Sequence, residues 1–107
     1  MKYLENSSRE SKVYGETSLQ ALLLVVMNAY MPMQGKSLTI QELRQYNKAF
    51  DILERDHEGV IPLEDGELAV VKKVVGWMSP LIPAVMRDAP FLEDMLNGAR
   101  DTASDDS

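Results

Sequence analysis

The hydrophobic positions of the chain recur mainly at intervals of three and four residues, a spacing that predicts helices. The first predicted helix begins at an N-cap, Thr17, and ends before Pro32. Its apolar stripe consists of Leu19, Leu22, Leu23, Val26 and Tyr30. Further apolar residues widen this stripe, so we expect the helix to be buried on more than one side.

The second predicted helix has the clearest start signal. Thr39 is followed three residues later by Glu42, which is the capping-box pattern. Apolar residues then recur at helical spacing with polar residues on the other faces, and the helix is expected to end near Arg55. After a turn, residues 60–61 are expected to be extended, because the residue before a proline, here Pro62, avoids the helical conformation.

The rest of the chain predicts further helices, separated by prolines. The inner face of the next helix is marked by Leu68, Val71, Val75 and Met78, and its first turn is acidic, which suits the helix dipole. Another helix is expected over residues 80–88, with Pro83 tolerated in its first turn. A last helix is expected over residues 91–96, closed by Gly98.

These elements predict an all-α protein, a small bundle of four to five helices with at most one short extended element near Val60. Residues 1–12 are polar and are expected to form a flexible N-terminal arm. A single helical domain is then expected to span residues 13–98, followed by a flexible acidic tail at residues 99–107.

Composition narrows the possible functions. The 107 residues include 17 acidic and 11 basic side chains, a formal net charge of -6, no cysteine and one histidine, His57. Neither a thiolate nucleophile nor a Cys- or His-based zinc site can be assembled from these residues, so we expect a non-enzymatic protein without a cofactor. The scattered, outnumbered basic residues argue against nucleic acid as a partner. The most apolar stretch, residues 19–33, is shorter than the roughly 20 residues that span a bilayer, so no membrane partner is expected.

One loop carries the approximate spacing of a calcium site. Glu54, Asp56, Glu58 and Asp65 fall at positions one, three, five and twelve of an EF-hand-like loop with Gly59 at position six. The match is degenerate, because the twelfth position holds an aspartate where the loop needs a longer, bidentate glutamate. The alternative is a helix connection whose carboxylates face water.

A group of methionine and aromatic residues predicts a partner-binding surface. Tyr30, Met31 and Met33 follow the most apolar helix, and Trp77 lies on the helix that contains residues 68–78. Methionine adapts to irregular surfaces, and tryptophan is enriched at interface hot spots. The alternative is that these side chains fill the core. Because the predicted helices are apolar over broad surfaces, we expect a protein partner or self-association.

The order of these segments resembles small helical proteins of unassigned role encoded by tailed bacteriophages and prophages. The resemblance rests on a Val-Tyr-Gly piece at residues 13–15, a charged helix at residues 38–53, the stretch 63–68 and a Pro-Leu-Ile element at residues 80–82. It covers about residues 13–96, and its motifs are generic hydrophobic patterns.

The resemblance implies a phage context. The first hypothesis is a virion or assembly component that acts through an apolar helical surface, located in the virion or the host cytoplasm. A second hypothesis is a phage regulator that binds a host protein such as the transcription machinery. A third is the degenerate calcium-binding module described above.

Overall fold

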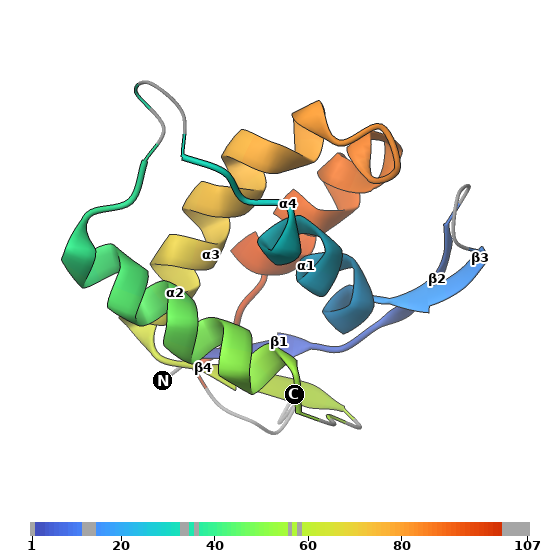
Figure 1. The fold of residues 1–107 in the computed structure, drawn as a ribbon. Coiled ribbons are helices and arrows are strands. Elements are labelled where there is room, and N and C mark those ends of the chain that lie inside the picture. Colours follow the sequence, from blue (N-terminus) through green and yellow to red (C-terminus); the bar gives the residue numbers. More distant parts are fainter. Residues whose placement is uncertain are drawn as a thin grey trace.

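The computed structural model describes residues 2–11, 15–32, 35, 37–55, 57 and 59–101. Its α-helices are α1 (Leu19–Asn28), α2 (Ile40–Leu53), α3 (Asp65–Met78) and α4 (Ala89–Asn97), with two short 3-10 helices, η1 (Ser79–Leu81) and η2 (Met86–Asp88). Its strands are β1 (Lys2–Glu5), β2 (Ser8–Ser11), β3 (Gly15–Ser18) and β4 (Val60–Leu63). Helix α3 contacts each of the other three α-helices, and the helices form one body (Figure 1).

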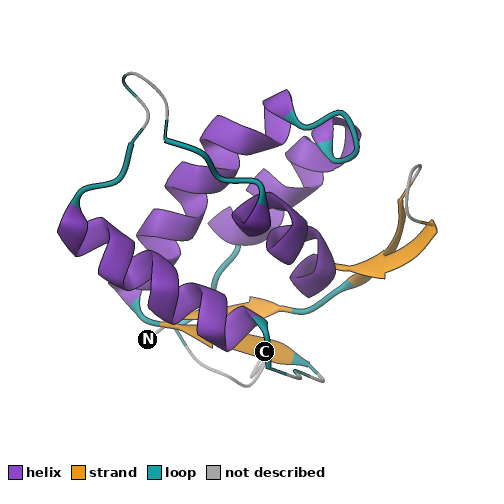
Figure 2. Cartoon of the chain, in the orientation of Figure 1, coloured by secondary structure: helices purple, strands orange, loops and turns teal. Residues whose placement is uncertain are grey.

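The expectation of an all-α fold is wrong at the N-terminus, where residues 1–12 were expected to form a flexible arm. Strand β1 pairs antiparallel with β4, and β2 pairs antiparallel with β3 (Figure 2). Leu4 anchors β1, since it is fully buried and lies opposite Ile61. Successive strand residues face opposite sides, so a four-residue strand needs only one such anchor, and its composition stays polar.

The far side of β1 is also paired. The Tyr3 N–H donates to the Arg100 carbonyl at 2.8 Å, and the Arg100 N–H donates to the Tyr3 carbonyl at 2.9 Å. The start of the expected acidic tail is therefore held against the sheet, and residues 102–107 lie outside the described residues. Residues 13–14 of the Val-Tyr-Gly piece also lie outside them.

Strand β4 confirms the extended element predicted before Pro62. Tyr3, the partner of Pro62 in the register, turns its main-chain groups towards Arg100 and away from β4. The nitrogen of Pro62 therefore faces the open edge of β4, where its lack of a hydrogen costs no ladder hydrogen bond.

Helix starts follow the capping signals closely. The Thr39 hydroxyl accepts from the Glu42 N–H at 3.1 Å, and the Thr39 N–H donates to the Glu42 carboxylate at 3.0 Å, which is the predicted capping box. Helix α1 is capped by Ser18, whose hydroxyl accepts from the Ala21 N–H at 3.3 Å, and Thr17 instead belongs to β3.

The helix predicted over residues 80–88 does not form. Ile82 is extended, with φ −102° and ψ 107°, and it separates η1 from η2. The cause is Pro83, whose ring disfavours the helical conformation of the residue before it. Helix α4 starts at Ala89, two residues before the predicted start, with Pro90 inside its first turn, where a missing N–H is harmless.

The core lies between α1, α3 and α4 and extends to the β1–β4 sheet. Fully buried side chains come from every one of these elements: Leu4, Leu22, Leu23, Val26, Ile61, Val71, Val74 and Leu92. The described α-helices thus bury apolar faces against one another as the sequence pattern predicts, and α2 lies across this body at the side of β4 (Figure 1).

Candidate functional site

Tyr30, the first of the predicted partner-binding residues, is half-buried directly after α1. Its hydroxyl accepts from the Leu38 N–H at 2.9 Å, and its ring centre lies 5.6 Å from that of Tyr46 on α2. Tyr46 in turn lies 6.0 Å from Phe50. Tyr30 therefore holds the connection between α1 and α2 in place, and most of its polar and aromatic surface is already used inside the chain.

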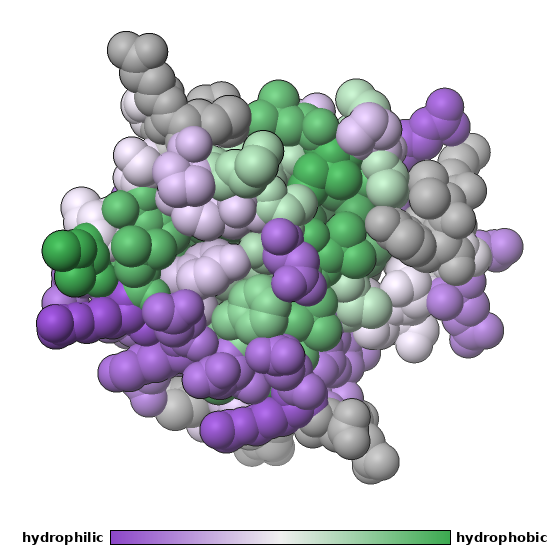
Figure 3. Space-filling view, viewed as in Figure 1, coloured by the Kyte–Doolittle hydropathy of each residue, from purple (hydrophilic) through white to green (hydrophobic). Residues whose placement is uncertain are grey.

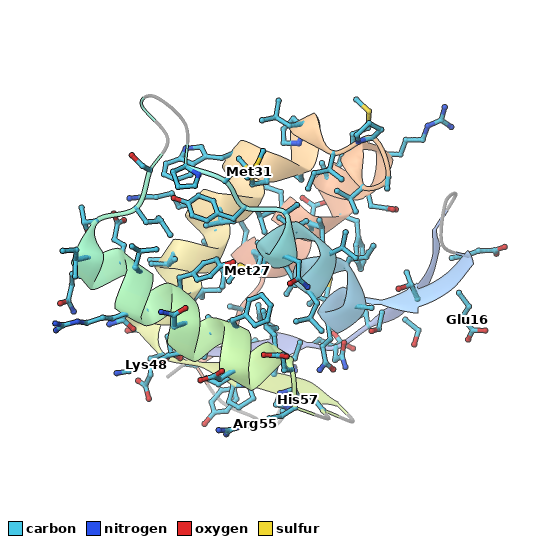
Figure 4. All side chains as sticks on the ribbon, in the orientation of Figure 1. Glu16, Met27, Met31, Lys48, Arg55 and His57 are labelled. Carbon is cyan, nitrogen blue, oxygen red and sulfur yellow. The ribbon has the colours of Figure 1, made fainter. Side chains whose placement is uncertain are left out.

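The methionines divide between core and surface. Met27 and Met78 are buried in the core, whereas Met31 is 66% exposed on the segment that follows α1 (Figure 4). Met33 lies outside the described residues. Of the predicted methionine contacts, Met31 is thus the one that the structure places at the surface.

Trp77 is half-buried on α3 and is covered by a charged side chain. The Lys73 ammonium lies 5.7 Å from the centre of the Trp77 ring, a cation–π distance. The same ammonium donates to the Glu42 carboxylate at the start of α2. This hydrogen bond, and then the one from the Thr39 N–H, lower the pKa of Glu42 below its ordinary value. The row Glu42–Lys73–Trp77 connects α2 to α3.

The sequence pattern missed the most exposed apolar residues near this row. Ile40 is 75% exposed and Leu43 is 38% exposed, although both fall on the predicted inner face of α2. Ala49 and Leu53, in the second half of α2, are fully buried. Helix α2 therefore leaves the core towards its N-terminus, and Figure 3 shows the apolar surface over its start. We call Ile40, Leu43 and the half-buried Trp77, which is linked to the start of α2 through Lys73 and Glu42, the α2 patch.

The predicted calcium ligands are only partly described. Glu54 is exposed at the end of α2, Asp65 is the first residue of α3, and Asp56 and Glu58 lie outside the described residues. Strand β4 separates Glu54 from Asp65. Within the described part of the chain, no three His, Asp or Glu side chains gather as a metal site would require.

A pocket of about 460 Å³ lies between α3 and α4. Its walls are mostly apolar and include Val75, Pro80, Pro90 and Leu96, and Lys72 and Glu93 also line it. The sequence analysis did not indicate this pocket. A glycine within the predicted helix, Gly76 in the last turn of α3, was the one available signal, because glycine is disfavoured in helices.

Comparison with known proteins adds no relative: no family model, no curated protein and no solved structure matches the chain. None of the helices in the described residues has the length and apolar character needed to cross a membrane. The α2 patch and the pocket between α3 and α4 are therefore the features that bear on function.

Proposed function

We propose that the protein is a non-enzymatic interaction protein whose α2 patch packs against another protein chain. The observation that carries the proposal is the exposure of Ile40 and Leu43, which lie three residues apart and therefore on one face of α2. Full burial of an isoleucine side chain contributes about 1.5–3 kcal/mol, and at Ile40 this free energy would be gained only when a partner covers the side chain.

The surroundings of the patch suit a protein interface. Trp77 offers a large aromatic surface, and tryptophan is common among the residues that dominate binding energy. The Glu42–Lys73 ion pair borders the apolar residues, and charges at the edge of an interface favour one register over others. A partner helix laid across the start of α2 would cover Ile40 and Leu43 together.

The resemblance to phage-encoded helical proteins supports a virion or assembly component as the setting of this interaction. In that setting the partner is a second copy of the chain or another structural protein. The proposal for the α2 patch does not depend on the phage origin, because it is argued from the exposure of named side chains.

Two measurements test the proposal. The first is light scattering after size exclusion over a wide range of protein concentration, and the second is binding of a polarity-sensitive dye. The variant Ile40→Asp places a charge in the patch, and Met86→Asp is the control, since Met86 is an exposed apolar residue that lies on η2. We expect the wild-type chain and the control to self-associate or bind dye, and Ile40→Asp to lose that property.

The result separates the two kinds of partner. Loss of a dimer in Ile40→Asp identifies a second copy, and loss of dye binding from a monomer indicates a different partner. A monomeric wild type that binds no dye contradicts the proposal, and so does an association that Ile40→Asp leaves unchanged.

A further inference from the structure

The pocket between α3 and α4 shares no lining residue with the α2 patch, and its walls are mostly apolar. Pro80 and Pro90 stand at its rim, and Val75 and Leu96 are buried beneath it. Its volume of about 460 Å³ falls in the range of about 300–1,000 Å³ found for ligand pockets. The Ser79 hydroxyl also lines the pocket, but it already donates to the Val75 carbonyl at 2.7 Å.

Gly76 lines this pocket, and no packing contact requires a glycine at this position. It lies in the last turn of α3, where glycine still lacks the helix propensity of alanine, yet a Cβ atom built there meets nothing within 4 Å. Gly66 on the same helix is different, since a Cβ there would lie 3.3 Å from the Gln45 side chain. The lack of a side chain at Gly76 keeps the pocket open and exposes the helix backbone to whatever enters it.

Charges of opposite sign stand at the pocket. Lys72 lies one turn before Gly76 on α3, and Glu93 lies on α4. Both are exposed, and neither forms an ion pair within the described residues. An occupant with an apolar centre, an acidic group near Lys72 and a basic group near Glu93 would satisfy both charges and fill the apolar space.

We propose that this pocket binds a short peptide segment of another protein, which places one bulky apolar side chain over Gly76 between an acidic and a basic residue. A short polypeptide can carry an acidic, an apolar and a basic side chain close together, which are the groups that this pocket would take. The site goes beyond the α2 patch, and either surface can be disabled without the other.

Amide chemical shifts measured during a peptide titration test the proposal. The probe is a blocked pentapeptide of sequence Asp-Ala-Leu-Ala-Lys, and the matched peptide is Ser-Ala-Leu-Ala-Ser. We expect the charged peptide to shift the amides of α3 and α4 around Gly76. The uncharged peptide should bind about fivefold more weakly, because exposed ion pairs contribute up to about 1 kcal/mol.

Two variants locate the binding in the pocket. Gly76→Leu fills the space and should abolish binding, whereas Ala69→Leu, at an exposed position of α3 outside the pocket, should not. Lys72→Glu should weaken binding of the charged peptide and leave binding of the uncharged peptide unchanged. This variant tests the site even if Gly76→Leu does not fold. Ile40→Asp should bind the peptide normally, which separates this site from the α2 patch.

The proposal is overturned if neither peptide shifts the amides around Gly76, or if both peptides bind equally well. It is also overturned if Gly76→Leu, folded by circular dichroism, binds like the wild type. A further check concerns stability: Gly76→Ala should raise the midpoint of thermal unfolding, because no packing contact requires glycine there. A lowered midpoint would assign Gly76 a structural role instead.

Discussion

The side-chain amide of Gln20 donates to the main-chain carbonyl of Leu53, with 2.6 Å between nitrogen and oxygen. The same amide donates to the Arg55 carbonyl. Gln20 lies in the first turn of α1 and Leu53 is the last residue of α2, so one side chain joins the beginning of one helix to the end of the other. The last carbonyls of a helix have no partner within it, and Gln20 supplies one from outside.

Two more side chains complete this junction. The side-chain amide of Asn6 donates to the main-chain carbonyl of His57 at 2.8 Å, and the main-chain N–H of Gln20 donates to the side-chain oxygen Oδ1 of Asn6 at 3.0 Å. The His57 ring donates through Nε2 to the Ile52 carbonyl at 2.6 Å. The single histidine thus closes the end of α2, and Asn6 fixes the chain between β1 and β2 against α1 and against His57, which follows α2.

Gln20→Ala is expected to lower the free energy of unfolding by about 1–3 kcal/mol, because it removes the donor to the Leu53 carbonyl in a part-buried hydrogen bond. Gln41→Ala is the matched control, since Gln41 is exposed in the first turn of α2, and its effect should stay within about 0.5 kcal/mol. Urea unfolding followed by circular dichroism measures both. Equal effects of the two substitutions would show that the junction contributes no stability.

The lowered pKa of Glu42 predicts a loss of stability in acid. Its ordinary value is about 4.5, and the hydrogen bond from Lys73 is the largest cause of the decrease. A carboxyl whose pKa is lower in the folded chain stabilises the fold above its unfolded pKa, and this contribution disappears as the pH falls through the folded pKa. Glu42→Gln should therefore cost stability near neutral pH and little at strongly acidic pH.

The matched control for Glu42→Gln is Asp51→Asn. Asp51 is exposed on the same helix and forms no ion pair within the described residues. Denaturant unfolding at several pH values from neutral to strongly acidic should show a flatter profile for Glu42→Gln than for Asp51→Asn. Parallel profiles would mean that the Glu42–Lys73 contact does not persist in solution.

Local signals in the sequence predicted much of the helical part of the fold. The capping box at Thr39 and the glycine after α4 act within a few residues, so the sequence displays them directly. Strand β1 could not be found in this way, because Leu4 is its only buried residue and its partner Ile61 lies far along the chain. The helix predicted over residues 80–88 was wrong, because Pro83 disfavours the helical conformation of the residue before it, Ile82.

The candidate surface was harder to predict than the fold. The apolar positions of α2 run from Ile40 to Leu53, but these two residues lie about 140° apart around an ideal helix, and the angle of the helix against the core leaves Leu53 buried and Ile40 exposed. That angle results from packing among distant elements, which the spacing within one helix does not encode. Gln20 appeared only as a polar interruption in an apolar stretch, because its partners at Leu53 and Arg55 come together in the folded chain alone.

The raised pKa of Tyr46 predicts a loss of stability at high pH. Burial raises the pKa of its hydroxyl above the ordinary value of about 10.0, and the neighbouring Tyr30 adds to the shift. The neutral hydroxyl, which donates to the Met27 carbonyl, is therefore favoured by folding. This contribution is complete below the unfolded pKa and is lost as the pH rises through the folded pKa.

Tyr46→Phe should lower the free energy of unfolding by about 1 kcal/mol near neutral pH and should make it less dependent on pH above 10 than in the wild type. Tyr3→Phe is the control, because the Tyr3 hydroxyl has no hydrogen bond to the described residues. Tyrosinate absorbance and unfolding measured in the same alkaline buffers provide the comparison. Identical alkaline profiles for wild type and Tyr46→Phe would refute the assignment.

The two methionines near the end of α1, Met27 and Met31, should contribute very differently to stability. Met27 is fully buried and Met31 is 66% exposed, although the sequence presents both as parts of one methionine-rich segment. Met27→Ala should cost about 2–5 kcal/mol, since it removes buried atoms and leaves a cavity. Met31→Ala should change stability by no more than about 0.5 kcal/mol, because its side chain is largely in water in the isolated chain. Thermal and urea unfolding of both variants decide the matter, and a large cost at Met31 would mean that its side chain is covered in solution.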